Sequence, residues 1–432
     1  MSARRRWRCL KGGSIPRDEG CFLWELVDLS AGLKFYRKFK IVKKIFYLSE
    51  SIFPSKSANS VHVMKMCGAF VRQGFDVELF GYKGNADLGE VKDFYNVKSS
   101  FKIFLFSTAD IFVNRLLIFC RRWVPGFRYG SIPNFLTGVR VVSEMKLGCD
   151  DVCYGRNLFW LCEFARRYPN NQFVLEVHRP PSGVLELLCL KYLVSRKGFK
   201  SCVVISSKLK ALMLDQCSFL RGGSVQVLHD GADETGWLFG QHRERLGAFK
   251  VGYVGHLYKG RGVQEVLIHV ARELSEVEFH IVGGTPDDLS VVLKRGIPAN
   301  MIIHGFKRQA ELPKLMECFD AVVAPYQDVT TVNNEGNTSP FMSPLKIFEY
   351  MAAQKAIVVS DLPVLHEVVT HNKECLFVNP ENVSEWVEAI KKLIFDDDMR
   401  RDLGVNARKR LVSQYSWDVR AGHISRLYEY NS

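Results

Sequence analysis

The alternation of apolar, strand-like segments with helix-like segments constrains the fold more than any other feature of this sequence. Residues 43–48 are apolar, and after a polar loop comes a segment with apolar residues at helical spacing that ends at Gly74. A second apolar segment follows at 76–81. Glycine is preferred just after a helix, and a helix between two strands joins them in parallel through a right-handed crossover. This part of the chain therefore predicts a parallel β-sheet covered by helices.

The same alternation continues in two series. Further strands of the first series are expected at 151–156, 173–178 and 201–207, and the segment 225–233 ends the first half with turn residues. After a charged linker, strands of the second series are expected at 251–255, 278–284, 301–306, 320–326, 356–361 and 375–379. A chain of 432 residues is too long for one ordinary domain. We therefore predict an α/β fold with two Rossmann-like, doubly wound domains that face an interdomain cleft.

We expect four parts along the chain. A basic N-terminal extension covers 1–40, with helical character around 21–29. The two Rossmann-like domains cover 41–235 and 245–412. The last part, 413–432, has apolar residues on one face of a terminal helix, which we expect to pack across the domains.

Charge and cysteine content limit the class of protein. The formal net charge of +13 indicates an anionic partner, such as a phosphate-bearing ligand, nucleic acid or an anionic membrane. The 12 cysteines are scattered without paired zinc spacing, which favours a reducing, cytoplasmic compartment. The N-terminus lacks the apolar segment of a secretory signal. Because Lys102, Asp110 and Arg115 interrupt the apolar run at 101–120, we do not expect a transmembrane helix there.

A glycine-rich loop at 252–267 follows one expected strand and opens a helix. Its glycines allow a ligand to approach the backbone closely, and Lys259 and Arg261 supply positive charge. The spacing matches neither a P-loop nor a dinucleotide-binding fingerprint. Taken alone, the loop is either an anion-binding site or a surface loop with two cations.

A second candidate is Glu349, which lies in a helix next to Phe348, Tyr350 and Met351. An unpaired carboxylate is costly to bury, so this side chain needs a partner. The alternatives are an exposed glutamate, a glutamate favoured by the helix dipole, and a carboxylate that binds ligand hydroxyls.

Together, these segments resemble the retaining nucleotide-sugar glycosyltransferases of the GT-B fold, glycosyltransferase family 4 (glycosyl transferases group 1). The resemblance extends from about residue 43 to the C-terminus, and five segments carry it in the family's order. They are "FPSKSANSVHVMKMCGAFVRQGFDVELF", "VLHDGAD", "YVGHLYKGRGVQEVL", "IHGFKRQAELPKLMECFDAVVAPY" and "SPLKIFEYMAAQKAIVVSDLPVLHEVV". The resemblance implies a hexosyltransferase-type enzyme with an N-terminal acceptor domain and a C-terminal donor domain.

The resemblance also implies a donor site. Arg261 matches the family's cation before Gly-Val and would bind the donor diphosphate, with Lys259 adding charge. His256 stands where a second cation often occurs, next to Gly255. Glu349 matches the second glutamate of the family signature and would bind the ribose hydroxyls.

Further donor contacts are implied on two loops. Main-chain groups around Phe306 and Lys307 would contact the nucleobase. Ser343, Leu345 and Lys346 would face sugar or phosphate oxygens.

The sequence departs from the family signature at Phe341. The first glutamate of the signature is expected there, and Glu335 lies just upstream. Because that glutamate normally contacts the donor sugar, the departure leaves the identity of that sugar open.

In the first half, Arg156, Glu176 and His178 are the candidate catalytic residues. The resemblance puts Arg156 near a position where many members have an active-site histidine. Glu176 and His178 end a strand, where they either contact the acceptor or the transferred sugar, or have an ordinary structural role.

Three further polar residues have no assigned role. His62 lies in the first turn of the helix after 57–60. His229 and Asp230 end another strand beside a glycine, where turn formation is the competing interpretation.

We expect no required metal and no cofactor besides the nucleotide-sugar co-substrate. Sugar transfer passes through an oxocarbenium-like state, so the departing diphosphate must be stabilised. No Asp-x-Asp stands at a strand end, and Asp396 and Asp398 are interpreted as helix caps. The resemblance implies retention of configuration, with the donor phosphate taking the acceptor proton.

A basic and aromatic stretch at 115–130 suggests a surface for anionic lipid. Its arginines alternate with aromatic residues and no acid interrupts them. A packed helix with a solvated basic edge is the alternative, and no recognised nucleic-acid-binding motif accompanies the stretch.

The sequence therefore predicts a cytoplasmic glycosyltransferase, peripheral on the inner membrane face, that uses a UDP- or GDP-sugar. Its acceptor would be a carbohydrate or a lipid-linked glycan in polysaccharide or glycolipid biosynthesis. One alternative is a catalytically inactive glycosyltransferase-like binding protein, suggested by Phe341 and Arg156. The other is an NAD-dependent oxidoreductase, which lacks the expected glycine fingerprint after the first strand.

Overall fold

The computed structural model describes residues 25–27, 34–36, 44–84, 90–107, 131–238, 247–286, 288–289, 296–330 and 337–429. Residues Met1–Ile41 form one unit and Val42–Ser432 another. In the first unit, β1 (Glu25–Val27) pairs antiparallel with β2 (Lys34–Tyr36). The helix expected around 21–29 is therefore wrong for Glu25–Val27, whose backbone pairs with a second strand. The rest of the extension lies outside the described residues.

The first half of the second unit is a parallel sheet of seven strands. Its order is β5-β4-β3-β6-β7-β8-β9. The strands are β3 (Lys44–Phe53), β4 (Asp76–Lys83), β5 (Lys102–Phe106), β6 (Val152–Gly155), β7 (Phe173–Val177), β8 (Phe199–Val204) and β9 (Val225–Val227). The helices that connect them are α1 (Ala58–Arg72), α2 (Val91–Phe94), α4 (Ser131–Glu144), α5 (Leu158–Arg167), α6 (Val184–Val194) and α7 (Ser207–Gln216), with a short turn at Gly222–Ser224.

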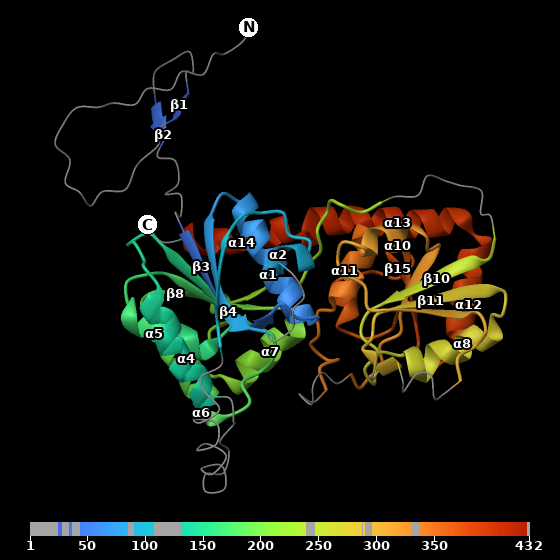
Figure 1. Cartoon of the computed structure of the whole chain (residues 1–432), viewed down its shortest axis with the longest axis horizontal. Coiled ribbons are helices and arrows are strands. Elements are labelled where there is room, and N and C mark those ends of the chain that lie inside the picture. Colours follow the sequence, from blue (N-terminus) through green and yellow to red (C-terminus); the bar gives the residue numbers. More distant parts are fainter. Residues whose placement is uncertain are drawn as a thin grey trace, which may run out of the picture. The chain divides into compact units, whose positions relative to one another are not determined.

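Both faces of this sheet are buried, as Figure 1 shows by the helices on either side. Along β3, Ile45 and Tyr47 belong to one apolar cluster, which includes residues of α1. Phe46 and Leu48 belong to the other cluster, which includes residues of α4 and α5. This alternation follows from the two-residue period of a strand and explains why the strand segments are almost continuously apolar.

The second half is a parallel sheet of six strands in the order β12-β11-β10-β13-β14-β15. The strands are β10 (Phe249–Val254), β11 (Val277–Val282), β12 (Met301–Gly305), β13 (Ala321–Ala324), β14 (Ala356–Ser360) and β15 (Cys375–Val378). Its helical segments are Val263–Leu267 with α8 (Ile268–Glu273), α10 (Leu312–Glu317), α11 (Leu345–Ala352), a short turn at Leu365–Glu367, α12 (Val383–Phe395) and α13 (Asp397–Arg410). Apolar side chains again cover both faces of the sheet.

The end of the chain returns to the first sheet. After α13, a wide turn at Leu411–Tyr415 leads into α14 (Trp417–Glu429). Trp417, Ala421, Ile424 and Tyr428 belong to the apolar cluster of α1 and β3. The last helix is thus part of the core of the first half.

The predicted α/β fold with two parallel, doubly wound sheets is confirmed. The domain boundaries derived from the sequence stay predictions. Sequence analysis missed β5, because the run at 101–120 was considered only as a membrane span, although Lys102–Phe106 pairs with β4. No helix in the described part of the chain is long and apolar enough to cross a membrane.

Gly262 provides a test of the backbone at the start of the second half. Its φ of +82° lies in the left-handed region, and a Cβ there would stand 1.7 Å from the Pro325 carbonyl oxygen. We expect Gly262→Ala to lower the free energy of unfolding by about 2–5 kcal/mol, since strain and overpacking add. Gly222→Ala is the control, because a Cβ there has no neighbour within 4 Å. Equal denaturation midpoints for the two variants would contradict this account.

Candidate functional site

A pocket of about 520 Å³ is lined by residues of both sheets. Arg156 and His178 line it directly after β6 and β7. Gly255 and Phe306 line it directly after β10 and β12. The pocket therefore lies at the carboxyl ends of the strands in both halves, where open parallel sheets bind ligands.

Positive groups without partners gather on the wall from the second half. Lys346 and Arg261 both line the pocket. Lys346 Nζ and Arg261 Nε are buried and have no hydrogen-bond partner in the part of the chain that the structure describes. Lys346 Nζ instead lies over the rings of Tyr253 and Tyr326, at 3.9 and 4.6 Å from their centroids. One buried and one half-buried basic side chain on the same wall are an arrangement suited to an anion.

The pKa values on this wall reflect burial and mutual repulsion. Burial, together with nearby Arg261, holds the pKa of Lys346 well below its usual value. Burial and the charges of Arg261 and Lys346 lower the pKa of His256 to about 4. An anion placed between these groups would favour their protonated forms.

Glu349 lines the same pocket from α11. Among the described residues, its carboxylate accepts one long hydrogen bond, from Gln309 Nε2 at 3.4 Å. Burial raises the pKa of Glu349 to about 7, against the lowering effects of Gln309 and Lys65. The carboxylate expected to need a partner thus faces a pocket with its hydrogen-bonding capacity mostly unused.

Phe306 and Lys307 lie at the edge of the pocket after β12. The Phe306 ring stacks on Phe94 with centroids 6.2 Å apart, and Lys56 Nζ lies 4.4 Å from its centroid. Because Phe94 and Lys56 come from the first half, this edge joins the two halves of the chain.

Phe341, the position of the departure from the family signature, also lines the pocket. Its side chain packs against the apolar cluster of the first half. Its carbonyl oxygen accepts a hydrogen bond from Ser206 Oγ at 3.0 Å. An apolar ring therefore occupies the wall where the resemblance predicts a carboxylate.

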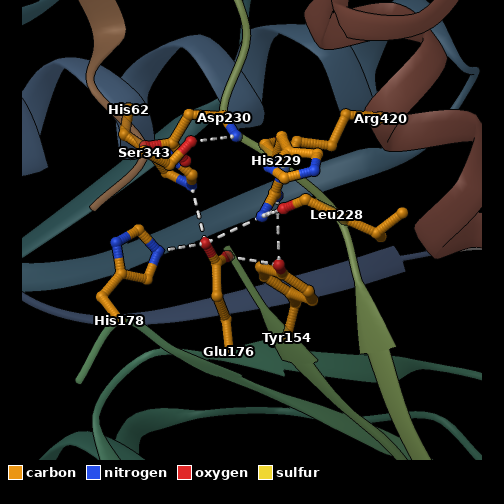
Figure 2. A network of polar contacts seen from close by, with 9 residues as sticks. All are labelled: His62, Tyr154, Glu176, His178, Leu228, His229, Asp230, Ser343 and Arg420. Carbon is orange, nitrogen blue, oxygen red and sulfur yellow. Dashed lines mark hydrogen bonds and ion pairs between the residues drawn. The ribbon is translucent and has the colours of Figure 1, made fainter. Parts of the chain in front are cut away.

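Glu176 is the centre of a buried polar network on the wall from the first half (Figure 2). Its Oε1 lies 3.0 Å from His62 Nε2, 2.5 Å from His178 Nε2 and 3.0 Å from Arg420 Nη2. Tyr154 donates its hydroxyl hydrogen to Oε2. Burial alone would raise the pKa of Glu176, but Arg420, His62 and His178 outweigh it and hold that pKa well below its usual value.

His178 connects this network with the pocket. Its side chain is 25% exposed, and Figure 2 shows its second ring nitrogen turned away from Glu176. Burial and the charge of Arg156 lower the pKa of His178 to about 4, although Glu176 opposes the shift. A neutral imidazole that donates Nε2–H to Glu176 keeps Nδ1 as an acceptor. The arrangement can accept a hydrogen bond from a ligand hydroxyl.

The network also reaches the loop that precedes α11. His62 Nδ1 lies 2.8 Å from Asp230 Oδ1, and the Asp230 N–H donates to Ser343 Oγ at 2.9 Å. Ser343 stands two residues before α11, the helix of Lys346 and Glu349. The two walls of the pocket are thus joined through one aspartate.

His62, Glu176, His178 and Asp230 could in principle hold a metal ion, because their ligand atoms lie within 4.8 Å of one another. However, the Arg420 guanidinium already contacts Glu176 Oε1 at 3.0 Å, so a positive charge already lies next to this carboxylate. His62 lies between the two carboxylates, with Nε2 near Glu176 Oε1 and Nδ1 near Asp230 Oδ1. Contacts within the protein therefore already surround both carboxylates of the cluster.

The structure brings together almost all of the predicted site residues. The pocket is lined by the following predicted residues: Arg156, Glu176, His178, Gly255, His256, Arg261, Phe306, Lys307, Ser343, Leu345, Lys346 and Glu349. Lys259 is exposed and is not among the lining residues. Sequence analysis missed Arg420 and Tyr154 and gave no role to His62 or Asp230, since no local motif marks them.

Comparison with known proteins agrees with this geometry. Residues 248–396 match the family described as glycosyl transferases group 1. The alpha-maltose-1-phosphate synthase of Mycolicibacterium smegmatis is 24% identical over 242 residues, which are 50% of this chain and 59% of that protein. The chain spans about half the length of the curated relatives it matches.

Solved structures match over nearly the whole chain. Anabaena Alr3699/HepE in complex with UDP and glucose superposes with a TM-score of 0.65 at 17% identity, covering 90% of this chain and 100% of that one. S. aureus TarM, in a complex with Fondaparinux, alpha-GlcNAc-glycerol and UDP, gives a TM-score of 0.63 at 12% identity, with 90% and 100% coverage. The fold of this chain is therefore GT-B, and its second half carries the match to the glycosyl transferases group 1 family.

The raised pKa of Glu349 predicts that one substitution changes the stability of the protein in a pH-dependent way. Since the folded-state pKa of about 7 exceeds the usual 4.5, the folded protein binds more protons than the unfolded one between these values. This contribution to stability therefore falls as pH rises from about 4.5 to 7. We expect Glu349→Gln to raise the free energy of unfolding at pH 8 by roughly 1–3 kcal/mol, with little gain at pH 4.5.

Denaturant titration at the two pH values measures this difference. Asp396→Asn is the control, because that carboxylate caps a helix far along the chain from the pocket residues. A Glu349→Gln variant that is less stable than the parent at pH 8 would contradict the account.

Proposed function

We propose that this protein is a glycosyltransferase that moves a sugar from a nucleotide-sugar donor to a carbohydrate or lipid-linked acceptor. The observation that carries the proposal is the pocket wall on which the buried atoms Arg261 Nε and Lys346 Nζ lie near Glu349 and have no hydrogen-bond partner in the described part of the chain. A nucleoside diphosphate supplies what this wall lacks, namely oxyanions for the two cations and ribose hydroxyls for the carboxylate. The match of 248–396 to the glycosyl transferases group 1 family supports the same assignment.

We propose UDP or GDP as the nucleotide, with UDP as the first choice. The solved GT-B structures in complex with UDP support this order. The pyrophosphate would lie between Arg261 and Lys346 at the start of α11, where backbone N–H groups also face an anion. The ribose would lie against Glu349, and the base against the main chain at Phe306 and Lys307.

The reaction would belong to the retaining chemistry of glycosyltransferase family 4, in the hexosyltransferase class. The bond from the anomeric carbon to the phosphate oxygen breaks, and a bond from that carbon to an acceptor oxygen forms on the same face. The acceptor proton passes to the departing phosphate oxygen. Arg261 and Lys346 would stabilise the charge that develops on the diphosphate, so this mechanism requires no metal.

Arg156 and His178 would face the transferred sugar or the acceptor. Both line the pocket, and Arg156 Nη1 has no hydrogen-bond partner in the described part of the chain. His178 Nδ1 would accept a hydrogen bond from a hydroxyl, held in this role by Glu176. Phe341 would make the neighbouring wall apolar, which favours a donor sugar that does not depend on a carboxylate there.

A protein that binds without turnover is the alternative, and donor-dependent release of UDP separates the two. Arg261→Ala and Glu349→Ala should each weaken UDP binding about ten- to hundredfold, because each removes a charge-assisted hydrogen bond worth roughly 1.5–3 kcal/mol. Lys259→Ala should bind as the parent does, because Lys259 does not line the pocket. Calorimetric titration with UDP and GDP measures these affinities.

Two outcomes would count against the proposal. Unchanged UDP affinity in both alanine variants would show that the site assignment is wrong. Binding of UDP-sugars without release of UDP, across a panel of donors and acceptors, would favour the binding protein.

We also propose a cytoplasmic enzyme that rests on the inner membrane face and takes part in polysaccharide or glycolipid biosynthesis. The basic stretch 115–130 lies outside the described residues. Directly after it, α4 exposes Phe135, Leu136 and Val139, with Arg140 beside them. Apolar side chains next to cations suit the surface of an anionic bilayer.

Vesicle sedimentation tests this contact. Replacing Arg115, Arg121, Arg122 and Arg128 by Gln should reduce binding to phosphatidylglycerol vesicles at least tenfold, since each cation near such a surface contributes about 1 kcal/mol. Replacing exposed Arg166 and Arg401 by Gln is the charge control. Equal binding by the parent and the variant, or equal binding to neutral vesicles, would contradict the contact.

A further inference from the structure

Arg420 is a charged residue on the buried face of the last helix. The buried residues of α14 are Trp417, Arg420, Ala421, Ile424, Ser425 and Tyr428, which follow the spacing of an apolar face. Arg420 interrupts that face with a guanidinium that is only 3% exposed. The buried face of a helix is normally apolar, and a residue that departs from this pattern in a well-packed core often has a functional role.

The hydrogen bonds of Arg420 account for its burial. Its Nε donates to the His229 carbonyl oxygen at 2.9 Å, and its Nη2 donates to Glu176 Oε1 at 3.0 Å. The Leu228 carbonyl oxygen and the Tyr154 hydroxyl lie at 3.3 and 3.4 Å. Figure 2 shows these groups around one guanidinium. Five donors in a fixed plane make such a set specific for arginine.

Glu176 transmits this contact to His178. The same oxygen, Oε1, contacts Arg420 Nη2 and His178 Nε2. Arg420 keeps the carboxylate ionised and fixed in place, and the carboxylate fixes the tautomer and the orientation of the imidazole. His62 Nε2 is the third group on this oxygen and adds a contact from α1.

We propose that Arg420 is a positioning residue, which from the last helix holds Glu176 so that His178 presents Nδ1 to the pocket. The catalytic part of this inference rests on the proposed function. A consequence is that α14, which follows the donor half in sequence, completes the wall of the acceptor half. Charged and titratable groups that face His178 are Glu176, His62, Arg156 and Asp230, and those that face Arg420 are Glu176, Tyr154 and Asp230.

A divalent cation is the competing occupant of this cluster. It would bind the same Oε1 of Glu176, close to the guanidinium, and the positive charges would repel. Arg420 already supplies a positive charge next to Glu176, and the same charge acts on Asp230. The geometry therefore favours arginine as the group that fixes Glu176.

The experiment compares Arg420→Met with Arg426→Met in the full chain. Arg426 lies on the exposed side of the same helix and contacts His423, so it controls for loss of charge from α14. The first readout is the titration of His178, followed by NMR of its imidazole signals. Loss of Arg420 removes a positive charge that lies next to Glu176. The pH midpoint of the His178 titration should therefore rise by about one pH unit or more. In Arg426→Met it should not move.

The second readout is kinetic. In Arg420→Met, kcat for release of UDP from a UDP-sugar should fall at least tenfold and its pH dependence should shift, while KM for the donor stays unchanged. UDP affinity should equal that of the parent, because Arg420 does not touch the donor wall. If methionine prevents folding, Arg420→Gln, which is neutral but still able to donate to the carbonyl oxygens, gives the same two readouts.

An unchanged His178 midpoint and unchanged kcat in a folded neutral variant would overturn the proposal. Broadening of the His178 signals by Mn²⁺ at stoichiometric amounts in the parent would also overturn it, in favour of a cation site. Absence of any UDP release by the parent would refute the proposed function, whereas the NMR titration would still decide whether Arg420 positions His178.

Discussion

Arg261 and Lys346 place two positive groups on one pocket wall, and neither has an acidic partner within ion-pair distance in the described part of the chain. Buried charge without a partner opposes folding, and the lowered pKa of Lys346 expresses that cost. Glu349 adds a carboxylate with a raised pKa to the same wall. Such costs are tolerated where a ligand later supplies the missing partners. The basic groups without acidic partners on this wall, and the shifted pKa values beside them, are therefore the basis of the functional account.

On the opposite wall, the central carboxylate of Glu176 already has partners within the protein. Around Glu176, the side chains of Arg420, His62 and Tyr154 approach from three separate helices or strands. Lys346 Nζ and Arg261 Nε have no hydrogen-bond partner in the described part of the chain, whereas Glu176 already contacts Arg420, His62 and His178. A reaction between two substrates fits this division, because one wall captures an anion and the other holds a fixed imidazole toward it.

Much of the fold follows from local sequence. Continuous apolar strands, a glycine after α1 and helical spacing between strands predict parallel sheets, and the observed strands lie within a few residues of the expected ones. The strand β5 was missed because its apolar run was considered at the length of a membrane span rather than of a strand. The helix expected around 21–29 failed because pairing with Lys34–Tyr36, which is not local, decides the backbone there.

Local sequence likewise predicts some residues of the site and not others. Glu349 and Arg261 stand in local motifs, so the sequence and the family resemblance lead to them. Arg420 lies 244 residues from Glu176 in the chain, and His62 lies on another element again. Nothing near Arg420 in the sequence distinguishes it from a surface arginine at helical spacing. Only the return of α14 to the first sheet brings these side chains together.

A crystal structure of the protein with UDP tests the central claim most directly. The account predicts the pyrophosphate within hydrogen-bond distance of Arg261 and Lys346, and the ribose hydroxyls on the carboxylate of Glu349. A well-ordered UDP bound elsewhere, with Arg261 and Glu349 both free of contact, would contradict it.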